Sequence, residues 1–198
     1  MKKLVIFDLD GTLLNTIADL AHSTNYALNK LGYPTHEIEK YNFMVGNGID
    51  KLFERALPEE EKSKENVLRV RKEFVPYYDI HNADDSRPYP GIPELLSYLQ
   101  NAGVQIAVAS NKYQAATQKL VDHYFPEIHF TAVFGQREGV KVKPDPIIVS
   151  DILEVAKVAK EEVLYVGDSG VDMQTAANAG VTACGAVSYT HLTLPTSD

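Results

Sequence analysis

The start of the chain constrains its fold and chemistry more than any other stretch. Residues 4–7, Leu-Val-Ile-Phe, form a short apolar run that is typical of a buried strand in a parallel sheet. Two carboxylates follow at Asp8 and Asp10, and Gly11 and Thr12 come directly after them. Residues two apart on a strand point to the same side, and open α/β sheets bind ligands at the carboxyl ends of their strands. We therefore expect both acids to lie at a ligand-binding edge.

Two acids in this position can serve several kinds of chemistry. One can attack a phosphorus atom and carry the phosphoryl group as an aspartyl phosphate. The other can act as general acid and then as general base. Together they can also hold a hard cation, which prefers carboxylate oxygens. The plainer interpretation is a strand end at which Asp caps the backbone of a turn, and this segment alone leaves that interpretation open.

Three later segments carry polar residues that could join this site. In the first, a polar residue ends an apolar run. In the second, a lysine precedes a proline, and in the third, an acidic cluster follows another apolar run. These segments are 104–110, 143–144 and 163–172. Together with the first segment, and in this order, they resemble the four motifs of the haloacid dehalogenase (HAD) superfamily of phosphohydrolases. The resemblance covers most of residues 1–187.

The periodicity of the chain predicts an α/β fold with a helical insertion. From residue 87 onward, helical and strand patterns alternate, which indicates a parallel sheet covered on both faces. Residues 15–86 carry helical stripes and no convincing strand. The resemblance implies a doubly wound core formed by residues 1–14 and 87–187, with residues 15–86 as a small all-helical cap. Such a cap closes over the site and excludes water.

Within the expected cap, helices are predicted over residues 15–31, 47–57 and 59–78, and Pro76 is expected to bend or end the third. Just before the second helix, two glycines flank an asparagine in the segment Gly46-Asn47-Gly48. This segment is either a loop that offers helix N-terminal amides to an anionic substrate or an ordinary turn with Asn47 as N-cap. The family has its specificity loop about here, which favours the first interpretation.

The resemblance implies a role for individual residues. Asp8 would be the nucleophile and Asp10 the general acid and base, while Ser110 and Lys143 would contact the phosphoryl group. Lys143 would also contact the Asp8 carboxylate. The implied ligands of a Mg²⁺ ion are Asp8, the backbone carbonyl of Asp10, Asp168 and, directly or through water, Asp172. The expected substrate-binding residues are Thr12, Ser110, Asn111, Lys143, Gly46, Asn47 and Gly48.

The substrate expectation comes from a narrower resemblance, to the bacterial phosphoglycolate phosphatases. It rests on residues 11–14, 19–20, 46–48 and 110–112. Asn15 departs from the many members that carry Asp, but it lies outside the four motifs. A mutase resembling β-phosphoglucomutase would share the same catalytic residues. Two alternatives of other classes are a catalytically silent HAD-like binding protein and a receiver-type phosphoacceptor module, although the helical insertion disfavours the receiver.

Composition narrows the partners. With 27 acidic and 19 basic residues, the net charge of −8 argues against a nucleic-acid-binding surface but not against a small phosphorylated metabolite. Met1-Lys2-Lys3 is followed by too few apolar residues for a signal peptide, and no apolar stretch is long enough to span a membrane. The single cysteine, Cys184, excludes an internal disulfide and is interpreted as a small buried residue of a strand. We expect a cytoplasmic monomer or homodimer without membrane or nucleic-acid partners.

The last eleven residues, 188–198, show no helical stripe. They resemble translated adapter sequence more than a native terminus, so we expect them to be a non-native tail.

Overall fold

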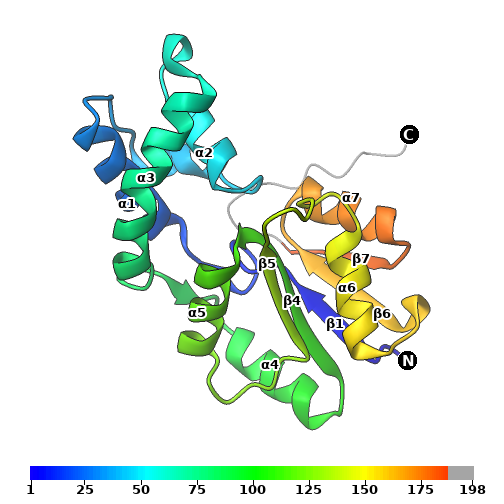
Figure 1. Ribbon diagram of the computed structural model, residues 1–198. Helices are drawn as coiled ribbons and strands as arrows, with labels where there is room; N and C mark the ends of the chain where they lie inside the picture. The colour runs from blue at the N-terminus through cyan, green and yellow to red at the C-terminus, as the bar shows by residue number, and fades with distance from the viewer. Residues whose placement is uncertain (187–198) are drawn as a thin grey trace, which may run out of the picture.

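The computed structural model describes residues 1–186, and its centre is a five-stranded parallel sheet (Figure 1). The strand order is β5–β4–β1–β6–β7. The strands are β1 (Leu4–Phe7), β4 (Gln105–Tyr113), β5 (Ala132–Gln136), β6 (Val163–Gly167) and β7 (Thr182–Gly185). The order places β1 at the centre of the sheet, and the predicted α/β class with a parallel sheet is confirmed.

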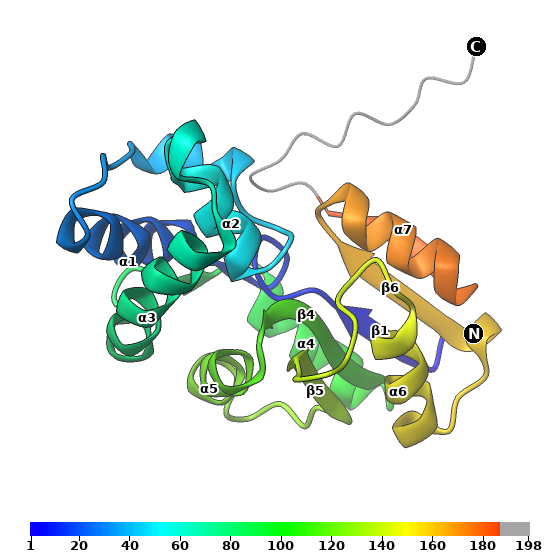
Figure 2. The same ribbon diagram turned by 45° about the horizontal axis from the view of Figure 1, so that its top comes forward.

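Helices cover both faces of the sheet (Figures 1 and 2). Because successive side chains of a strand point to opposite faces, β1 contributes to an apolar cluster on each face. Leu4 and Ile6 pack in one apolar cluster with α6 and α7. Val5 and Phe7 pack in a second cluster with α4 and α5. These helices are α4 (Ile92–Asn101), α5 (Gln114–Tyr124), α6 (Ile147–Ala156) and α7 (Gly170–Ala179).

A separate group of helices lies between β1 and β4 along the chain and stands to one side of the sheet (Figures 1 and 2). It consists of α1 (Ile17–Lys30), a 3-10 helix (Ile38–Phe43), α2 (Ile49–Ala56), a 3-10 turn (Glu59–Glu61) and α3 (Lys64–His81). Its apolar side chains form a cluster of their own. This separate core supports the proposed division of the chain into a cap and an α/β core.

The third helix of this group differs from the prediction of residues 59–78. Residues 59–61 form their own short turn, and α3 starts only at Lys64 because Ser63 caps it, accepting a hydrogen bond from the N–H of Asn66 (3.1 Å). The helix does not end at Pro76 but continues to His81. A proline inside a helix removes a backbone donor and crowds the carbonyl four residues earlier, but burial of the predicted inward side chains holds the helix in the core. Those buried positions are Val67, Val70, Phe74 and Tyr78.

The two connections between the helical group and the sheet run side by side. β2 (Leu14–Asn15) pairs antiparallel with β3 (Arg87–Pro88). Asp19, in the first turn of α1, accepts hydrogen bonds from the backbone N–H of Asp85 (2.9 Å) and from both the N–H (2.8 Å) and hydroxyl (2.6 Å) of Ser86. These contacts tie the start of the insertion to its end.

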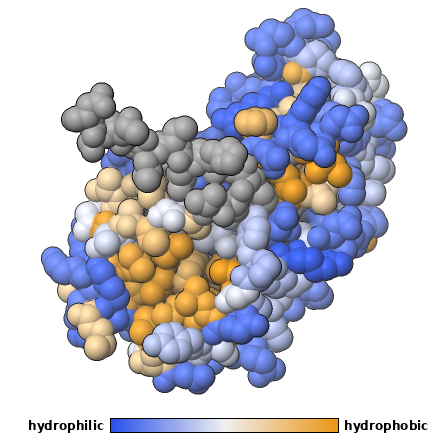
Figure 3. Space-filling model, turned by 180° about the vertical axis from the view of Figure 1, so that it is seen from behind, coloured by the Kyte–Doolittle hydropathy of each residue, from blue (hydrophilic) through white to orange (hydrophobic). Residues whose placement is uncertain are grey.

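The face of β6 and β7 on the side of α4 and α5 is less well covered. Figure 3 shows apolar side chains gathered on this face. Leu164 and Val166 are half-buried, and every residue of β7 is exposed. The prediction that Cys184 is buried is therefore wrong: it is exposed, on a strand at the edge of the sheet.

Two other predictions concern the ends and surroundings of the chain. The tail proposed at 188–198 lies outside the described residues. Among residues 1–186, no helix combines the length and apolar character that a membrane crossing requires.

Candidate active site

Asp8 lies where β1 ends, at the carboxyl edge of the sheet. Its backbone N–H donates a hydrogen bond to the carbonyl of Val166 on the neighbouring strand (2.9 Å), and the residue is only 8% exposed. Burial raises the pKa of the Asp8 carboxyl, and the nearby carboxylates of Asp172 and Asp168 raise it further. The Lys143 ammonium opposes them, but the pKa stays well above its ordinary value. The site therefore concentrates negative charge around Asp8.

The turn after Asp8 brings the first and fourth motifs into contact. Gly11 has a φ of 86°, and a Cβ at this position would lie 2.3 Å from a carboxylate oxygen of Asp168. Both the backbone conformation and the close approach require glycine here. The hydroxyl of Thr12 donates a hydrogen bond to the other oxygen of Asp168 (3.3 Å). Thr12 thus contacts an acidic side chain instead of the cleft.

Asp10 is held by two side chains that contact the same oxygen. The Nζ of Lys112 lies 3.0 Å from Oδ1 of Asp10, and the hydroxyl of Thr16 donates to that oxygen at 2.6 Å. The sequence predicts no role in catalysis for Lys112. Its place two residues after Ser110 is the one sequence signal that could have pointed to it.

Lys143 is a buried cation between two acids. Its Nζ lies 2.7 Å from Asp172 and 3.0 Å from Asp8, and it donates a hydrogen bond to the carbonyl of Ala109 (2.9 Å). Burial alone would lower the pKa of Lys143, but Asp172 and Asp8 outweigh it and raise that pKa well above its ordinary value. The side chain is a fixed positive charge next to the Asp8 carboxylate.

Asp172 is fully buried, and both of its oxygens accept hydrogen bonds. Oδ1 accepts from Lys143 and from the hydroxyl of Tyr165 (3.2 Å), and Oδ2 accepts from the hydroxyl (2.6 Å) and N–H (3.2 Å) of Ser169. Ser169 in turn caps α7 by accepting from the N–H of Asp172. Burial would raise the pKa of Asp172, but Lys143 and Ser169 hold it below its ordinary value.

Three buried carboxylates could hold a metal ion. Oxygens of Asp8, Asp168 and Asp172 all lie within 4.8 Å of one another. Carboxylate oxygens are the ligands that hard cations prefer, and Lys143 is the one ammonium that contacts this group among the described residues. The donor set and the surplus of negative charge therefore fit a divalent cation.

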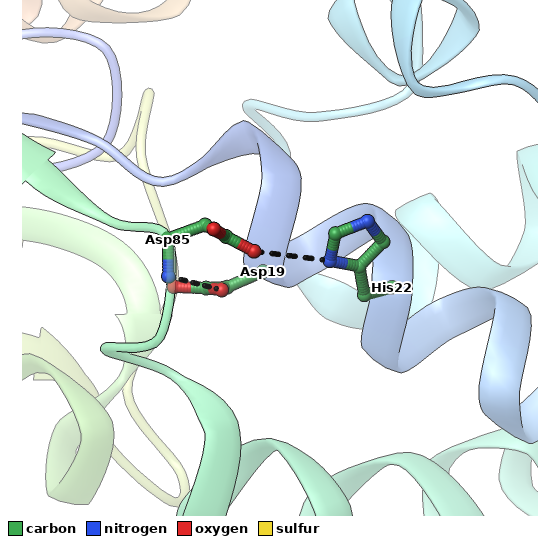
Figure 4. A group of neighbouring side chains, drawn as sticks. All are labelled: Asp19, His22 and Asp85. Carbon is green, nitrogen blue, oxygen red and sulfur yellow. Dashed lines mark hydrogen bonds and ion pairs between the residues drawn. The ribbon is translucent and has the colours of Figure 1, made fainter.

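A second cluster of acids and a histidine lies where the chain connects the helical group to the sheet (Figure 4). It consists of Asp19, His22 and Asp85. Both oxygens of Asp19 accept hydrogen bonds from the chain around Asp85, and His22 lies 3.4 Å from the Asp85 carboxylate at the surface. These contacts explain the cluster as a structural tie.

A cleft runs between the sheet edge and the helical group. From the sheet side it is lined by Asp8, Asp10, Ser110, Asn111, Lys112, Asp168 and Ser169. From the helical side it is lined by Leu20, Val45, Gly46, Gly48, Ile49 and Leu52. The cleft thus has a polar and charged floor and a largely apolar roof.

The loop of the helical group reaches the sheet through Asn111. The side-chain amide of Asn111 donates to the carbonyls of Gly46 (3.3 Å) and Lys143 (3.2 Å), and its oxygen accepts from the N–H of Lys143 (2.8 Å). Asn47 instead accepts a hydrogen bond from Arg55 (2.7 Å). The N-cap of α2 is Gly48, without a side-chain bond, so Asn47 does not cap this helix.

Known proteins resemble this chain over most of its length. The sequence model of the haloacid dehalogenase-like hydrolases matches residues 5–186. The chain belongs to this family. It is 32% identical to a phosphoglycolate phosphatase of Mesorhizobium japonicum, over 91% of this chain and 80% of the relative, and 34% identical to one of Vibrio parahaemolyticus, over 92% and 82%.

Solved structures of related proteins share the fold of this chain. A crystal structure of a predicted phosphoglycolate phosphatase from Haemophilus somnus superposes with a TM-score of 0.85 at 30% identity, covering 93% of this chain and 84% of the other. The predicted membership of the HAD superfamily is confirmed, and so is the enzyme class of a phosphoric monoester hydrolase.

Proposed function

We propose that this HAD-like hydrolase is a Mg²⁺-dependent phosphatase that hydrolyses a small phosphomonoester through an aspartyl phosphate. The substrate that we propose is 2-phosphoglycolate. The observation that supports it best is the Asp8 carboxylate at the floor of the cleft, 3.0 Å from the buried Lys143 ammonium, with Asp10 lining the same cleft. The names of the relatives support the choice of substrate.

In the first step, an Asp8 oxygen forms a bond to phosphorus, and the bond from phosphorus to the leaving oxygen breaks. Asp10 gives its proton to that oxygen, which leaves as an alcohol. In the second step, a water oxygen forms a bond to phosphorus while Asp10 takes a proton from that water. The bond from phosphorus to the Asp8 oxygen breaks, which releases phosphate and restores the Asp8 carboxylate. Lys143 offsets charge beside Asp8, and the Ser110 hydroxyl, which lines the cleft, can donate a hydrogen bond to a phosphoryl oxygen.

Asp8, Asp168 and the backbone carbonyl of Asp10 would hold the Mg²⁺ ion. When bound, the ion offsets the negative charge of the phosphoryl group and of the carboxylates around it. Because both oxygens of Asp172 already accept hydrogen bonds, we assign this residue to orienting Lys143 and contacting the ion through water.

The roof of the cleft suits a small substrate. Gly46 and Gly48 place backbone groups at the cleft, while Leu20, Ile49 and Leu52 exclude water from it. The carboxylate of 2-phosphoglycolate would lie near the N-terminus of α2, where backbone amides favour an anion. Asn47 would stabilise this loop through Arg55 instead of contacting the substrate directly.

The test is phosphate release from 2-phosphoglycolate by the full chain, with Mg²⁺ and with chelator. We expect turnover with Mg²⁺ only, and its loss in Asp8→Asn. Asp122→Asn, which makes the same change at an exposed position of α5, should keep full activity. Metal-independent turnover, or turnover that survives in Asp8→Asn, would contradict the proposal. Interconversion of sugar phosphates without net phosphate release would favour the mutase alternative.

A further inference from the structure

Lys112 is a buried cation that the proposed chemistry does not yet use. It follows Ser110 by two residues, in the stretch of β4 between Ala109 and Tyr113 where the register with β5 shifts. Its side chain is 2% exposed, although it borders the cleft. A buried ammonium loses its hydration and is retained only where a charge or hydrogen-bond partner compensates it. The contacts of this lysine therefore indicate its purpose.

Lys112 has one contact on each side. Towards the sheet edge, its Nζ lies 3.0 Å from Oδ1 of Asp10. Towards the helical group, the same nitrogen lies 4.8 Å from the centre of the Tyr78 ring on α3, a distance at which an ammonium is attracted to the ring face. The Tyr78 side chain is fully buried and stacks on Phe74. The lysine thus lies between a rigid aromatic ring and the Asp10 carboxylate.

These contacts fix the orientation of Asp10. Thr16 donates to the same oxygen that Lys112 contacts, so two groups act on Oδ1. A carboxylate is planar, and holding one oxygen from two directions also sets the direction of the other. The backbone N–H of Lys112 also donates to the Ser110 hydroxyl (3.2 Å), so Lys112 contacts both Asp10 and Ser110.

We propose that Lys112 is a positioning residue that holds the Asp10 side chain in the orientation for proton transfer, and that the Tyr78 ring holds Lys112 there. This inference rests on the proposed function, in which Asp10 moves the proton. A direct role in binding the substrate is the competing explanation. The existing ion pair with Asp10 and the small exposed fraction of the side chain disfavour it.

With a substrate whose leaving group needs no proton, the two steps of the reaction depend on Asp10 to different degrees. With p-nitrophenyl phosphate, Asp8 forms its bond to phosphorus and p-nitrophenolate leaves with the bonding electrons, without needing a proton. Hydrolysis of the aspartyl phosphate still requires a base for the attacking water. A misplaced Asp10 should therefore slow the second step more than the first, and the phosphorylated enzyme should accumulate.

The experiment compares Lys112→Met with Lys3→Met on both substrates in Mg²⁺. Lys3 forms an exposed ion pair with Glu162 at the amino-terminal side of β1, so Lys3→Met makes the same chemical change away from the cleft. For Lys112→Met we expect a fall of about 100-fold in kcat on 2-phosphoglycolate, within the range for general acid–base catalysis, with KM changed less than about threefold. With p-nitrophenyl phosphate we expect a burst of one p-nitrophenolate per enzyme before slow turnover.

Further variants test whether the charge of Lys112 and its contact with the Tyr78 ring are what orient Asp10. Lys112→Arg keeps the positive charge and should recover at least part of the lost kcat. Tyr78→Phe keeps the ring face and should be nearly as active as wild type, whereas Tyr78→Leu should share the direction of Lys112→Met. If Lys112→Met does not fold, Thr16→Val removes the other contact to Oδ1 and carries the same expectation for the burst.

The outcomes are distinguishable. A raised KM with unchanged kcat would assign Lys112 to substrate binding. An equal loss of activity on both substrates without a burst would make its role structural. Either result would overturn the positioning role of Lys112 and leave the proposed function standing. If wild type releases phosphate from neither substrate, or if Asp8→Asn keeps its activity, the proposed function fails and takes this inference with it.

Discussion

Replacing Lys143 by methionine should destabilise the protein strongly, because it leaves two buried acids without their cation. The ammonium lies 2.7 Å from Asp172 and 3.0 Å from Asp8. At an effective dielectric constant of about 20, Coulomb's law gives about 6 kcal/mol for each contact. Desolvation of the ammonium offsets much of this, and removing one partner of a buried ion pair typically costs about 3–5 kcal/mol.

For a chain of this length, that cost corresponds to a fall in Tm of about 6–20 °C. The assay is thermal unfolding followed by circular dichroism in chelator, so that no divalent cation replaces the ammonium. Lys141→Met is the matched control, because its side chain is 82% exposed and pairs with Asp145 at 3.4 Å. Its free energy of unfolding should change by no more than about 1 kcal/mol. A Lys143→Met variant that melts within 2 °C of wild type, at about the level of the control, would refute the reasoning.

Two further predictions concern the connections and the packing behind the site. Asp19→Ala removes the acceptor of three hydrogen bonds from Asp85 and Ser86, so limited proteolysis should cleave within residues 82–87 faster than in wild type; His22→Ala, which loses only an exposed pair, should not. Gly135→Ala should lower the free energy of unfolding by about 1–3 kcal/mol, because its Cβ would lie 2.5 Å from the carbonyl oxygen of Lys112. Gly170→Ala meets no atom within 4 Å and should be near neutral in the same urea titration; equal effects of the two substitutions would contradict this packing argument.

An apolar run followed by a polar residue predicted two of the strand ends, since Asp8 directly follows β1 and Asp168 directly follows β6. The strand end predicted at Ser110 is wrong, because β4 continues to Tyr113, with its register to β5 shifted after Ala109. All three residues line the same cleft because β4 and β6 both flank β1. The buried stripe of α3 was also predictable, because helical spacing alone defines it.

What the sequence did not predict depends on contacts between distant residues. Lys112 contacts Asp10 from the part of β4 where the register with β5 shifts, and no local pattern predicts that shift. The orientation of Asn47 depends on Arg55, eight residues later. Cys184 is exposed with the rest of its edge strand, whereas β5 at the other edge has buried residues, and a short apolar run does not predict which edge strand is covered.

The pairing of β2 with β3 has a consequence for how such a protein can diversify. Asn15 lies opposite Arg87, so the chain leaves the sheet domain and returns to it at one point, as the two arms of a hairpin do. The entropy of closing such a loop grows only with the logarithm of its length. The helices between these positions can therefore be shortened, extended or exchanged for another module without changing the register of the five strands. Substrate preference can then evolve in the insertion while the reacting groups keep their places.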